Sequence, residues 1–476
     1  MTHGGVFNTI LSMEANKKLI WTLLIIAGIV FLARLLSLPF DILYDTTDAR
    51  YAEIGRIMAE TGDWLTPYIS GTAPIQIQGT LAHMYPFWAK PPLSFWATAA
   101  SIKVFGINEF GAKLPHFLFL LASVALAWAF VRRYAGKLAA AALVAILATT
   151  TMFVFYMGGV MTDPALVFCL TLAMLSFYNS INRANIKNKQ VAPKRSEGGW
   201  GYLFFIALGL GLLAKGPLML VLVGLPIFAY VLIKKKWRDL FHNLPIISGL
   251  LLMLVIAAPW YIMAERATPG FLNYFFIGEH WERYLTPNWA GDMYGAGRGG
   301  FFGKIWLFWL MMIAPWSIYF AVKMFWKKFR TQIRETNFFG NEFLFYNLCF
   351  AIAPLVFFTM SKNILITYAL VSSIPTAILL AAVIPLDTRK FKWFAGFNVF
   401  AIIIFCAIPG LKPSEKSDII AAQGANIYYY RVDPPYSASF YSDGRAVRID
   451  ALSVAHSGDV VFQKTGRNAY QKMEIK

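Results

Sequence analysis

Long apolar stretches, separated by short polar or basic turns, follow one another along the chain from about residue 19 to about residue 409. Most are long enough to cross roughly 30 Å of hydrocarbon as an α-helix. We therefore predict an all-α polytopic membrane protein with about eleven spans and at most about thirteen. The predicted spans lie near residues 19–38, 112–131, 136–157, 163–181, 200–214, 217–233, 244–263, 304–325, 342–360, 364–384 and 393–409.

The composition agrees with a membrane protein. Hydrophobic residues make up 58% of the 476 positions, aromatic residues 16% and charged residues 14%, and the mean hydropathy is +0.54. A soluble domain has roughly 45–50% apolar residues, so the composition excludes an ordinary soluble protein. A net charge of +18 would suggest nucleic-acid binding in a soluble chain. Here the basic residues follow the membrane topology instead, and we expect no nucleic-acid partner.

Basic clusters recur on every second turn between the predicted spans, as the positive-inside rule expects of cytoplasmic turns. They lie at residues 132–137, 183–195, 234–238, 327–334 and 389–392. Lys17 and Lys18 precede the first span, and no small-residue cleavage site follows it, so we interpret this span as a retained anchor. This topology puts the loops 39–111 and 264–303, and the tail after about residue 410, on the outer side of the membrane.

The chain changes character after about residue 410. We divide it into a membrane domain, 1–410, and a small outer C-terminal domain of α/β or β type, 411–476. In the tail, strand-like runs flank Ser442-Asp443-Gly444, which is a hairpin signal. A domain of this size has little stability of its own, so we expect it to pack on the outer loops.

Most acidic residues outside the tail fall in the outer loops, and the predicted spans contain almost no ionisable side chain. Ionisable residues inside the membrane commonly mark ion or proton pathways, so their scarcity favours an enzyme over a coupled transporter. Cys169, Cys349 and Cys406 fall within predicted spans, and we interpret them as small apolar side chains. No G-x-G-x-x-G motif follows a predicted strand and no Walker-type loop is present, which disfavours a soluble nucleotide substrate.

Several motifs follow one another between about residues 20 and 385. They are D-A-R-Y-A-E-I-G-R-I-M-A-E-T-G-D-W-L-T-P from Asp48, K-P-P-L-S-F-W from Lys90, F-G-I-N-E-F-G-A-K-L-P from Phe105, M-T-D-P-A-L from Met161, A-K-G-P from Ala214, P-W-Y from Pro259, F-F-I-G-E-H-W-E-R-Y from Phe275 and S-K-N-I-L-I-T-Y from Ser361. Together they resemble the lipid A aminoarabinose transferases. With the protein O-mannosyltransferases, these belong to the multispanning class-C glycosyltransferases that use polyprenyl-phosphate sugars.

The resemblance implies a transferase that moves a sugar, such as aminoarabinose or galactosamine, from undecaprenyl phosphate to lipid A. The reaction would take place on the periplasmic face of the bacterial inner membrane. The implied catalytic candidates are Asp48, Asp163 and Asp45. The candidates for binding the donor phosphate are Lys90, Arg283, Lys362 and Tyr368, and those for binding substrate are Arg50, Tyr51, Glu53, Glu279 and His280.

A lipid-linked donor also supports these roles on chemical grounds. Breaking its anomeric bond develops negative charge on the departing phosphate, and fixed cations in a poorly hydrated site stabilise that charge best. Pro91 and Pro92 fix the backbone beside Lys90. A carboxylate would act as general base on a hydroxyl acceptor. If the acceptor is a lipid A phosphate, the carboxylate would instead bind a sugar amine or stabilise an oxocarbenium-like centre.

The sequence departs from the family pattern at two places in the first outer loop. The family commonly reads D-E-x-R-Y, but Thr47, Asp48 and Ala49 precede Arg50 here. The essential aspartate is therefore Asp48 or Asp45. Ala89 stands where the family often has a glutamate before the K-P-P-L lysine. The metal site stays unassigned for this reason, and the sequence indicates no certain cofactor.

Each motif also has a purely structural interpretation. Asp163 before Pro164 suits a helix N-cap, Glu279 with Arg283 suits an ion pair on a surface helix, and Lys362 suits the anchor of a span end. Two other functions also stay open. One is transfer from a polyprenyl-phosphate sugar to protein or another envelope glycan. The other is a non-catalytic lipid flippase or transporter, which would tolerate loss of Asp48.

Overall fold

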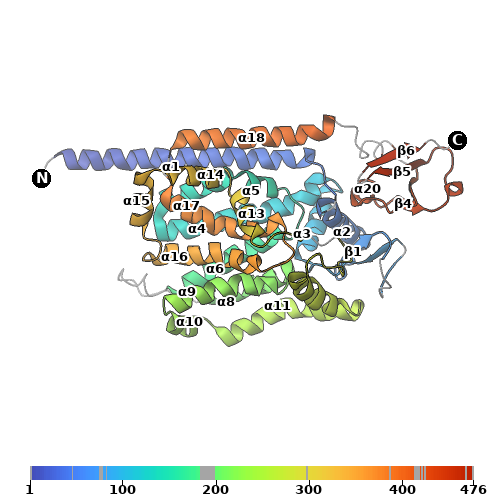
Figure 1. The fold of residues 1–476 in the computed structure, drawn as a ribbon, viewed down its shortest axis with the longest axis horizontal. Helices are drawn as coiled ribbons and strands as arrows, with labels where there is room; N and C mark the ends of the chain where they lie inside the picture. The colour runs from blue at the N-terminus through green and yellow to red at the C-terminus, as the bar shows by residue number, and fades with distance from the viewer. Residues whose placement is uncertain are drawn as a thin grey trace.

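Helices aligned with one long axis form the body of the molecule, and a small sheet lies at the C-terminal end (Figure 1). The computed structural model describes residues 3–473 apart from 46, 74–78, 82, 183–198, 296–298, 385–386, 412–418, 420–421, 423–424 and 467–468. The helices of the body are α1 (His3–Ser37), α4 (Glu109–Ala148), α5 (Thr151–Tyr156), α6 (Asp163–Ile181), α8 (Gly199–Lys215), α9 (Leu218–Ile233), α10 (Trp237–Asn243), α11 (Ile246–Ala267), α13 (Lys304–Met312), α14 (Trp316–Lys323), α15 (Lys327–Thr336), α16 (Glu342–Thr359), η4 (Ile366–Ser372), α17 (Ser373–Val383) and α18 (Thr388–Leu411).

Six stretches within these elements are long and apolar enough to cross a membrane, which makes the chain a multi-pass integral membrane protein. They are Lys17–Phe40, Glu109–Ala148, Asp163–Ile181, Ile246–Ala267, Glu342–Thr359 and Ile366–Val383. A seventh is obtained if α13 and α14, bent by 101° at their junction, form one broken span. Among the described residues, α3 (Leu93–Phe105), α8 and α9 are apolar but shorter. The total of about eleven spans therefore stays a prediction.

Two predicted spans differ in shape from the expected straight helices. The predicted 136–157 span is the second half of α4, which bends at Gly136, followed by α5 after a break at Thr149 and Thr150. The predicted 304–325 span is divided between α13 and α14, with Pro315 at the start of α14. Proline has no backbone N–H to continue a helical ladder, which is consistent with a break at this place.

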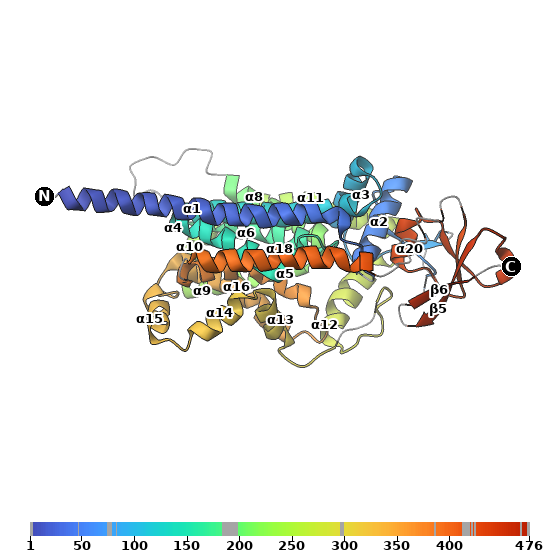
Figure 2. The same cartoon turned by 90° about the horizontal axis from the view of Figure 1, so that it is seen from above.

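The loops predicted to lie on one side of the membrane gather at one end of the bundle. The first loop contains η1 (Leu38–Phe40), α2 (Thr47–Thr61), β1 (Tyr68–Ser70), β2 (Met84–Pro86) and α3 (Leu93–Phe105), and the loop after α11 contains η3 (Asn273–Glu282), a π-helix, and α12 (Arg283–Leu285). Both lie toward the end that carries the C-terminal sheet, whereas α10 and α15 lie at the opposite end (Figures 1 and 2). The strands β1 and β2 pair antiparallel, Ile69 opposite Tyr85.

The C-terminal region contains a four-stranded sheet with the strand order β4-β3-β5-β6. Its elements are β3 (Ile427–Tyr430), α20 (Tyr436–Tyr441), β4 (Ala446–Ile449), η5 (Leu452–Val454), β5 (Val460–Gly466) and β6 (Ala469–Met473). The prediction of a hairpin at Ser442-Asp443-Gly444 is wrong. β3 and β4 are parallel, parallel strands require a crossover connection, and α20 lies in that connection. The Ser-Asp-Gly turn follows α20.

The helix α20 attaches this region to the first outer loop. Phe440 is fully buried and belongs to the main hydrophobic core, whereas the sheet has a separate small core around Tyr429 and Phe462. The Tyr441 hydroxyl accepts a hydrogen bond from the Leu43 N–H at 3.0 Å. The tail therefore packs on the residues that lead into α2.

Candidate functional site

Lys90 and Glu279 form an ion pair at the end of the bundle that carries the C-terminal sheet. The Lys90 Nζ lies 2.9 Å from Glu279 Oε2, and Arg283 Nη1 lies 2.9 Å from Glu279 Oε1. Arg283 also lies 3.2 Å from Asp292. Burial alone would raise the pKa of Glu279, but Lys90 and Arg283 outweigh it and hold this pKa at about 2. The predicted ion pair of Glu279 with Arg283 thus exists, but Glu279 is buried and does not lie on a solvated face.

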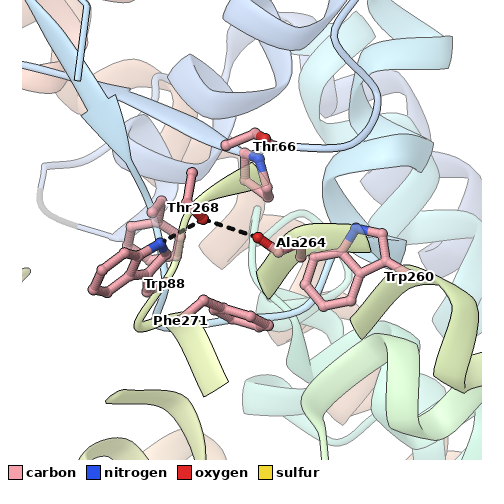
Figure 3. A pocket seen from close by; sticks show the side chains of 8 residues that line it. Thr66, Trp88, Trp260, Ala264, Thr268 and Phe271 are labelled. Atoms are coloured by element: carbon pink, nitrogen blue, oxygen red, sulfur yellow. Dashed lines mark hydrogen bonds between the residues drawn. The ribbon is translucent and has the colours of Figure 1, made fainter. Parts of the chain in front are cut away.

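The backbone that carries Lys90 is fixed through Trp88. The Trp88 indole N–H donates to Thr268 Oγ1 at 3.0 Å, and Thr268 Oγ1 donates to the Ala264 carbonyl at 3.1 Å (Figure 3). The cavity between these side chains is only about 10 Å³. The Trp88 backbone N–H also donates to the Tyr294 hydroxyl at 3.0 Å. These contacts hold the K-P-P-L segment against the end of α11 and the loop before α13.

A second ion pair joins Asp163 at the start of α6 to Lys215 at the end of α8. The Lys215 Nζ lies 2.5 Å from Asp163 Oδ1 and 5.2 Å from the centre of the Tyr368 ring. The interpretation of Asp163 as a helix N-cap is wrong, because Thr162 is the N-cap and no side chain caps this helix. The Asp163 carboxylate pairs with a buried lysine instead.

Gly216 places Lys215 next to the π-helix η3. Its φ of +77° suits glycine, and a Cβ at this position would lie 2.5 Å from the Phe275 ring. The A-K-G-P motif therefore brings the second ion pair toward the element that carries Glu279. Burial raises the pKa of Tyr51, and the nearby charges of Arg50, Lys215, Glu279 and Asp163 also act on its hydroxyl.

Asp48 and Asp45, three residues apart, have different surroundings. The Asp45 carboxylate accepts hydrogen bonds from the Ser437 N–H, at 3.2 Å, and from the Ser437 hydroxyl. Asp48 is half-buried, and in the part of the chain that the structure describes it forms no ion pair. Burial raises the pKa of Asp48 to about 6, and Lys113 and Arg34 oppose that rise. Asp45 is therefore the aspartate whose carboxylate is bound by a residue of the C-terminal tail, Ser437.

The other predicted residues of the first loop lie around this site in different roles. Arg50 donates to the Tyr294 carbonyl, and its guanidinium lies 5.2 Å from the centre of the Tyr51 ring. Tyr51 packs edge-on against Phe87. Glu53 is fully buried, and its carboxylate accepts hydrogen bonds from Arg56 and Ser70. Tyr51 thus packs against Arg50 and Phe87, whereas Glu53 braces α2 against β1.

His280 was predicted to bind substrate and Lys362 to bind the donor phosphate, but neither side chain joins the ion pairs described above. Both ring nitrogens of His280 face backbone carbonyls, Phe275 at 2.7 Å and Lys215 at 3.4 Å. Burial lowers the pKa of His280, which favours the neutral form of the ring. The Lys362 side chain is exposed and forms no ion pair within the described ranges. Its backbone N–H donates to the Tyr284 carbonyl at 2.9 Å.

Two guanidinium nitrogens at this site lack partners. Arg283 Nε and Arg50 Nε are buried and donate to no described residue. Buried N–H groups without an acceptor are uncommon unless a ligand or a water accepts their hydrogen bond. An open cavity of about 590 Å³ is lined by Trp88, Tyr274, Glu282, Trp289, Met293 and Asp292, and Asp292 contacts Arg283. The arrangement can therefore receive an anionic group beside a pocket rich in aromatic side chains.

The residues present offer little to a metal ion. Among the residues outside the masked segments, no three His, Cys, Asp or Glu side chains lie close enough to hold one. Ala89 has no ligand atom on its side chain, and His280 directs both nitrogens at carbonyls. The donor set does not fit a divalent metal, so we derive no chemical step through one.

Several charged residues of this region were not predicted as site residues. They are Arg34, Asp41, Lys113, Lys215 and Asp292. Lys215 and Lys113 stand in the motifs A-K-G-P and F-G-I-N-E-F-G-A-K-L-P, where a lysine at the end of an apolar stretch was a usable signal. Arg34 and Asp41 pair with each other seven residues apart, across the end of α1 and η1, where helical spacing gives no signal.

The apolar helices define a polytopic membrane protein, and a cluster of charged residues lies at one end of its helix bundle. The chain belongs to the dolichyl-phosphate-mannose-protein mannosyltransferase family, whose model matches residues 19–275.

Curated relatives refine this comparison. The chain is 28% identical over 375 residues to the undecaprenyl phosphate-α-4-amino-4-deoxy-L-arabinose arabinosyl transferase of Enterobacter sp. (strain 638), covering 77% of this chain and 59% of that protein. The protein of the same name from Edwardsiella ictaluri is 25% identical over 359 residues, covering 75% of this chain and 58% of its own length. The chain thus spans under two thirds of the length of these relatives.

Solved structures give the fold. ArnT from Cupriavidus metallidurans bound to undecaprenyl phosphate superposes with a TM-score of 0.72 at 19% identity, covering 93% of both chains. The apo form of the same protein superposes with a TM-score of 0.70 at 20% identity, covering 90% of this chain and 85% of that one. The predicted resemblance to the aminoarabinose transferases is confirmed.

Proposed function

We propose that the protein is a glycosyltransferase that moves an amino sugar, of the aminoarabinose type, from undecaprenyl phosphate to lipid A. The names of the curated relatives support the donor and the sugar. The similarity in fold to a protein solved with undecaprenyl phosphate supports the lipid carrier. In this proposal the reaction takes place on the periplasmic face of the inner membrane, the side to which the positive-inside rule assigns the charged cluster.

The proposal rests on the two cations beside Glu279, Lys90 and Arg283, each of which has an N–H group without an acceptor among the described residues. A lysine ammonium has three N–H donors, and Lys90 uses two of them on the Ala89 carbonyl and Glu279. Arg283 keeps its buried Nε without a partner among the described residues. A phosphate bound between Lys90 and Arg283 would accept hydrogen bonds from the remaining N–H groups of both side chains. It would also place the departing oxygen where its negative charge is stabilised.

The carboxylates have a separate task at the sugar. Asp48 and Asp163 are the carboxylates that we assign to the reacting sugar or the acceptor. An ionised Asp48 would remove a proton from a hydroxyl acceptor or stabilise the positive charge that develops at the anomeric carbon. Either role requires the negative form of the side chain. Asp45, which is held by Ser437, positions the segment before Asp48.

Mass spectrometry of lipid A tests the proposal. Lipid A from a strain that expresses the gene should carry an added amino sugar, which disappears on deletion and returns with the wild-type gene but not with Asp48→Asn at equal protein level. An unchanged lipid A spectrum on deletion in an expressing strain would contradict lipid A as acceptor.

The same strains distinguish the alternatives. Loss of sugar from an envelope protein or another glycan, with lipid A unchanged, would favour transfer to that acceptor. The family description, a protein mannosyltransferase, is the observation behind this second candidate. Full complementation by Asp48→Asn together with a defect in lipid translocation would instead favour a flippase.

A further inference from the structure

Three consecutive residues between α12 and α13, Asp292, Met293 and Tyr294, contact both loops that carry the candidate site. The Asp292 carboxylate lies 3.2 Å from Arg283 and accepts the Tyr294 N–H at 3.0 Å, which closes a tight turn. The Met293 N–H donates to the Tyr274 hydroxyl at 3.2 Å. The side chains of Asp292 and Tyr294 are buried. The segment is thus fixed to η3 and α12 at the point where it meets the first loop.

The Tyr294 hydroxyl binds the backbone just before Lys90 at two places. It donates to the Pro86 carbonyl at 2.7 Å and accepts the Trp88 N–H at 3.0 Å. Pro91 follows Lys90, and a residue that precedes proline has a restricted backbone conformation. The backbone that carries Lys90 is therefore restricted on both sides, by the Tyr294 hydroxyl and by the proline ring.

Aromatic contacts hold the Tyr294 ring in place. Its centre lies 4.5 Å from that of Phe87, and it stacks on Tyr85 at 5.9 Å with an interplanar angle of 10°. The Tyr294 carbonyl accepts a hydrogen bond from Arg50 on α2. Tyr294 thus joins the segment that carries Lys90 to a second cation of the first loop.

We propose that Tyr294 is a positioning residue for the donor phosphate: its hydroxyl fixes the Lys90 backbone so that the ammonium meets the phosphate together with Arg283. This inference rests on the proposed function, in which Lys90 and Arg283 bind the phosphate of the lipid carrier. Groups that are fixed before a ligand arrives lose less conformational freedom on binding. Loss of the Tyr294 hydroxyl should therefore weaken phosphate binding, although both hydrogen bonds of this hydroxyl stay within the protein.

The test is the equilibrium binding of undecaprenyl phosphate to the purified full chain, with the Tm of each variant measured alongside. Tyr294→Phe removes the hydroxyl and keeps the ring, so the affinity should fall about two- to tenfold, the usual range for a lost hydrogen bond. Tyr284→Phe is the matched control, because the Tyr284 hydroxyl also donates to a backbone carbonyl, that of Phe357, at 2.7 Å. Its loss should leave the affinity unchanged.

A double-mutant cycle with Lys90→Ala separates positioning from a general effect on the structure. Because Tyr294 acts through Lys90, Tyr294→Phe should weaken binding in the wild-type background and leave it unchanged in Lys90→Ala. If Tyr294→Phe is too unstable to purify, Thr268→Val tests the same route to Lys90. It removes the acceptor of the Trp88 indole N–H, and its effect on affinity should likewise vanish in Lys90→Ala.

Two results would overturn the inference. One is an equal affinity in wild type and Tyr294→Phe, and the other is the same loss of affinity on the wild-type and Lys90→Ala backgrounds. For Thr268→Val, an equal loss on both backgrounds has the same meaning. Absence of undecaprenyl-phosphate binding by the wild type contradicts the proposed function instead.

Discussion

Lys90 donates to its neighbour's carbonyl and to Glu279, and Trp88 fixes the backbone beside it. We expect Lys90→Ala to lose a charge-assisted contact with the donor phosphate worth about 1.5–3 kcal/mol. That corresponds to a loss of about tenfold to more than a hundredfold in transfer rate. Lys90→Arg should recover part of the rate, because a planar fork replaces a compact ammonium.

Undecaprenyl-phosphate binding to the purified variants is the measurement for Lys90. Affinity should fall in Lys90→Ala, fall less in Lys90→Arg and stay unchanged in Lys103→Ala, whose ammonium lies 5.5 Å from the Trp64 ring and away from Glu279. Equal affinities in wild type, Lys90→Ala and Lys90→Arg would rule out a phosphate-binding role and leave Lys90 as a structural partner of Glu279.

The two aspartates of the first loop should differ in effect. Asp48→Asn should abolish transfer at a normal protein level, because the ionised form is needed at the sugar or acceptor. Asp45→Asn should matter less, since the amide oxygen can still accept from Ser437. Asp163→Asn should reduce transfer strongly, because Lys215 loses its counter-charge. Full activity in Asp48→Asn, measured by product formation, would move the catalytic role to Asp45.

Glu279 gives a prediction about stability. Glu279→Gln leaves Lys90 and Arg283 without their shared carboxylate and should lower the free energy of unfolding at pH 7 by about 3–5 kcal/mol. Because the folded pKa is depressed to about 2, the ion pair stabilises the fold fully above the ordinary carboxyl pKa and is lost as the pH falls toward about 2.

Thermal unfolding of the detergent-solubilised protein measures this effect. The difference in Tm between wild type and Glu279→Gln should be constant from pH 8 to about pH 5 and shrink at lower pH. Glu335→Gln, on an exposed part of α15, should change Tm little. A Glu279→Gln variant as stable as wild type at pH 7 would contradict the structural part of the account.

At the scale of residues, the sequence predicted local contacts better than distant ones. The pair Glu279 and Arg283 is four residues apart, so helical spacing was enough to suggest it. The pair of Asp163 with Lys215 joins two helices, and the pair of Asp41 with Lys113 joins the segment after η1 to α4. Such pairs depend on how helices pack, which apolar periodicity within one helix does not specify.

At the scale of elements, the apolar stretches identified most of the long helices, because length and hydropathy alone define a candidate span. The tail shows where this reasoning fails. The run Tyr436–Tyr441 is rich in residues that favour strands, yet it forms α20. Its Phe440 is buried in the core of the membrane domain, and that tertiary contact outweighed local propensity.

The arrangement of the loops predicts a topology that can be measured. Single cysteines introduced at Leu285 and Asp450 should react with a membrane-impermeant maleimide from the periplasm. A cysteine at Lys328 should react only after permeabilisation, because the basic turns should face the cytoplasm. Cys169 and Cys349 are buried and Cys406 is half-buried, so their background labelling should be low. Protection of position 285 in spheroplasts would divide the proposed site between two compartments.

At the scale of the whole molecule, three charged groups from different parts of the chain converge on one end of the helix bundle. They are the pair Lys90–Glu279, the pair Asp163–Lys215 and the group of Arg34, Asp41 and Lys113. The tail, attached by α20, covers the segment between the last group and α2. The chain spans under two thirds of its curated relatives, so the transfer activity itself has to be measured on this protein.

Reconstituted transfer is the most direct measurement. The purified full chain, given an undecaprenyl-phosphate-linked aminoarabinose and lipid A, should produce amino-sugar-modified lipid A detectable by mass spectrometry. The rate should fall about tenfold to more than a hundredfold in Lys90→Ala, and product should be absent in Asp48→Asn. Failure of the wild type to form product from this donor, or an undiminished rate in both variants, would contradict the account.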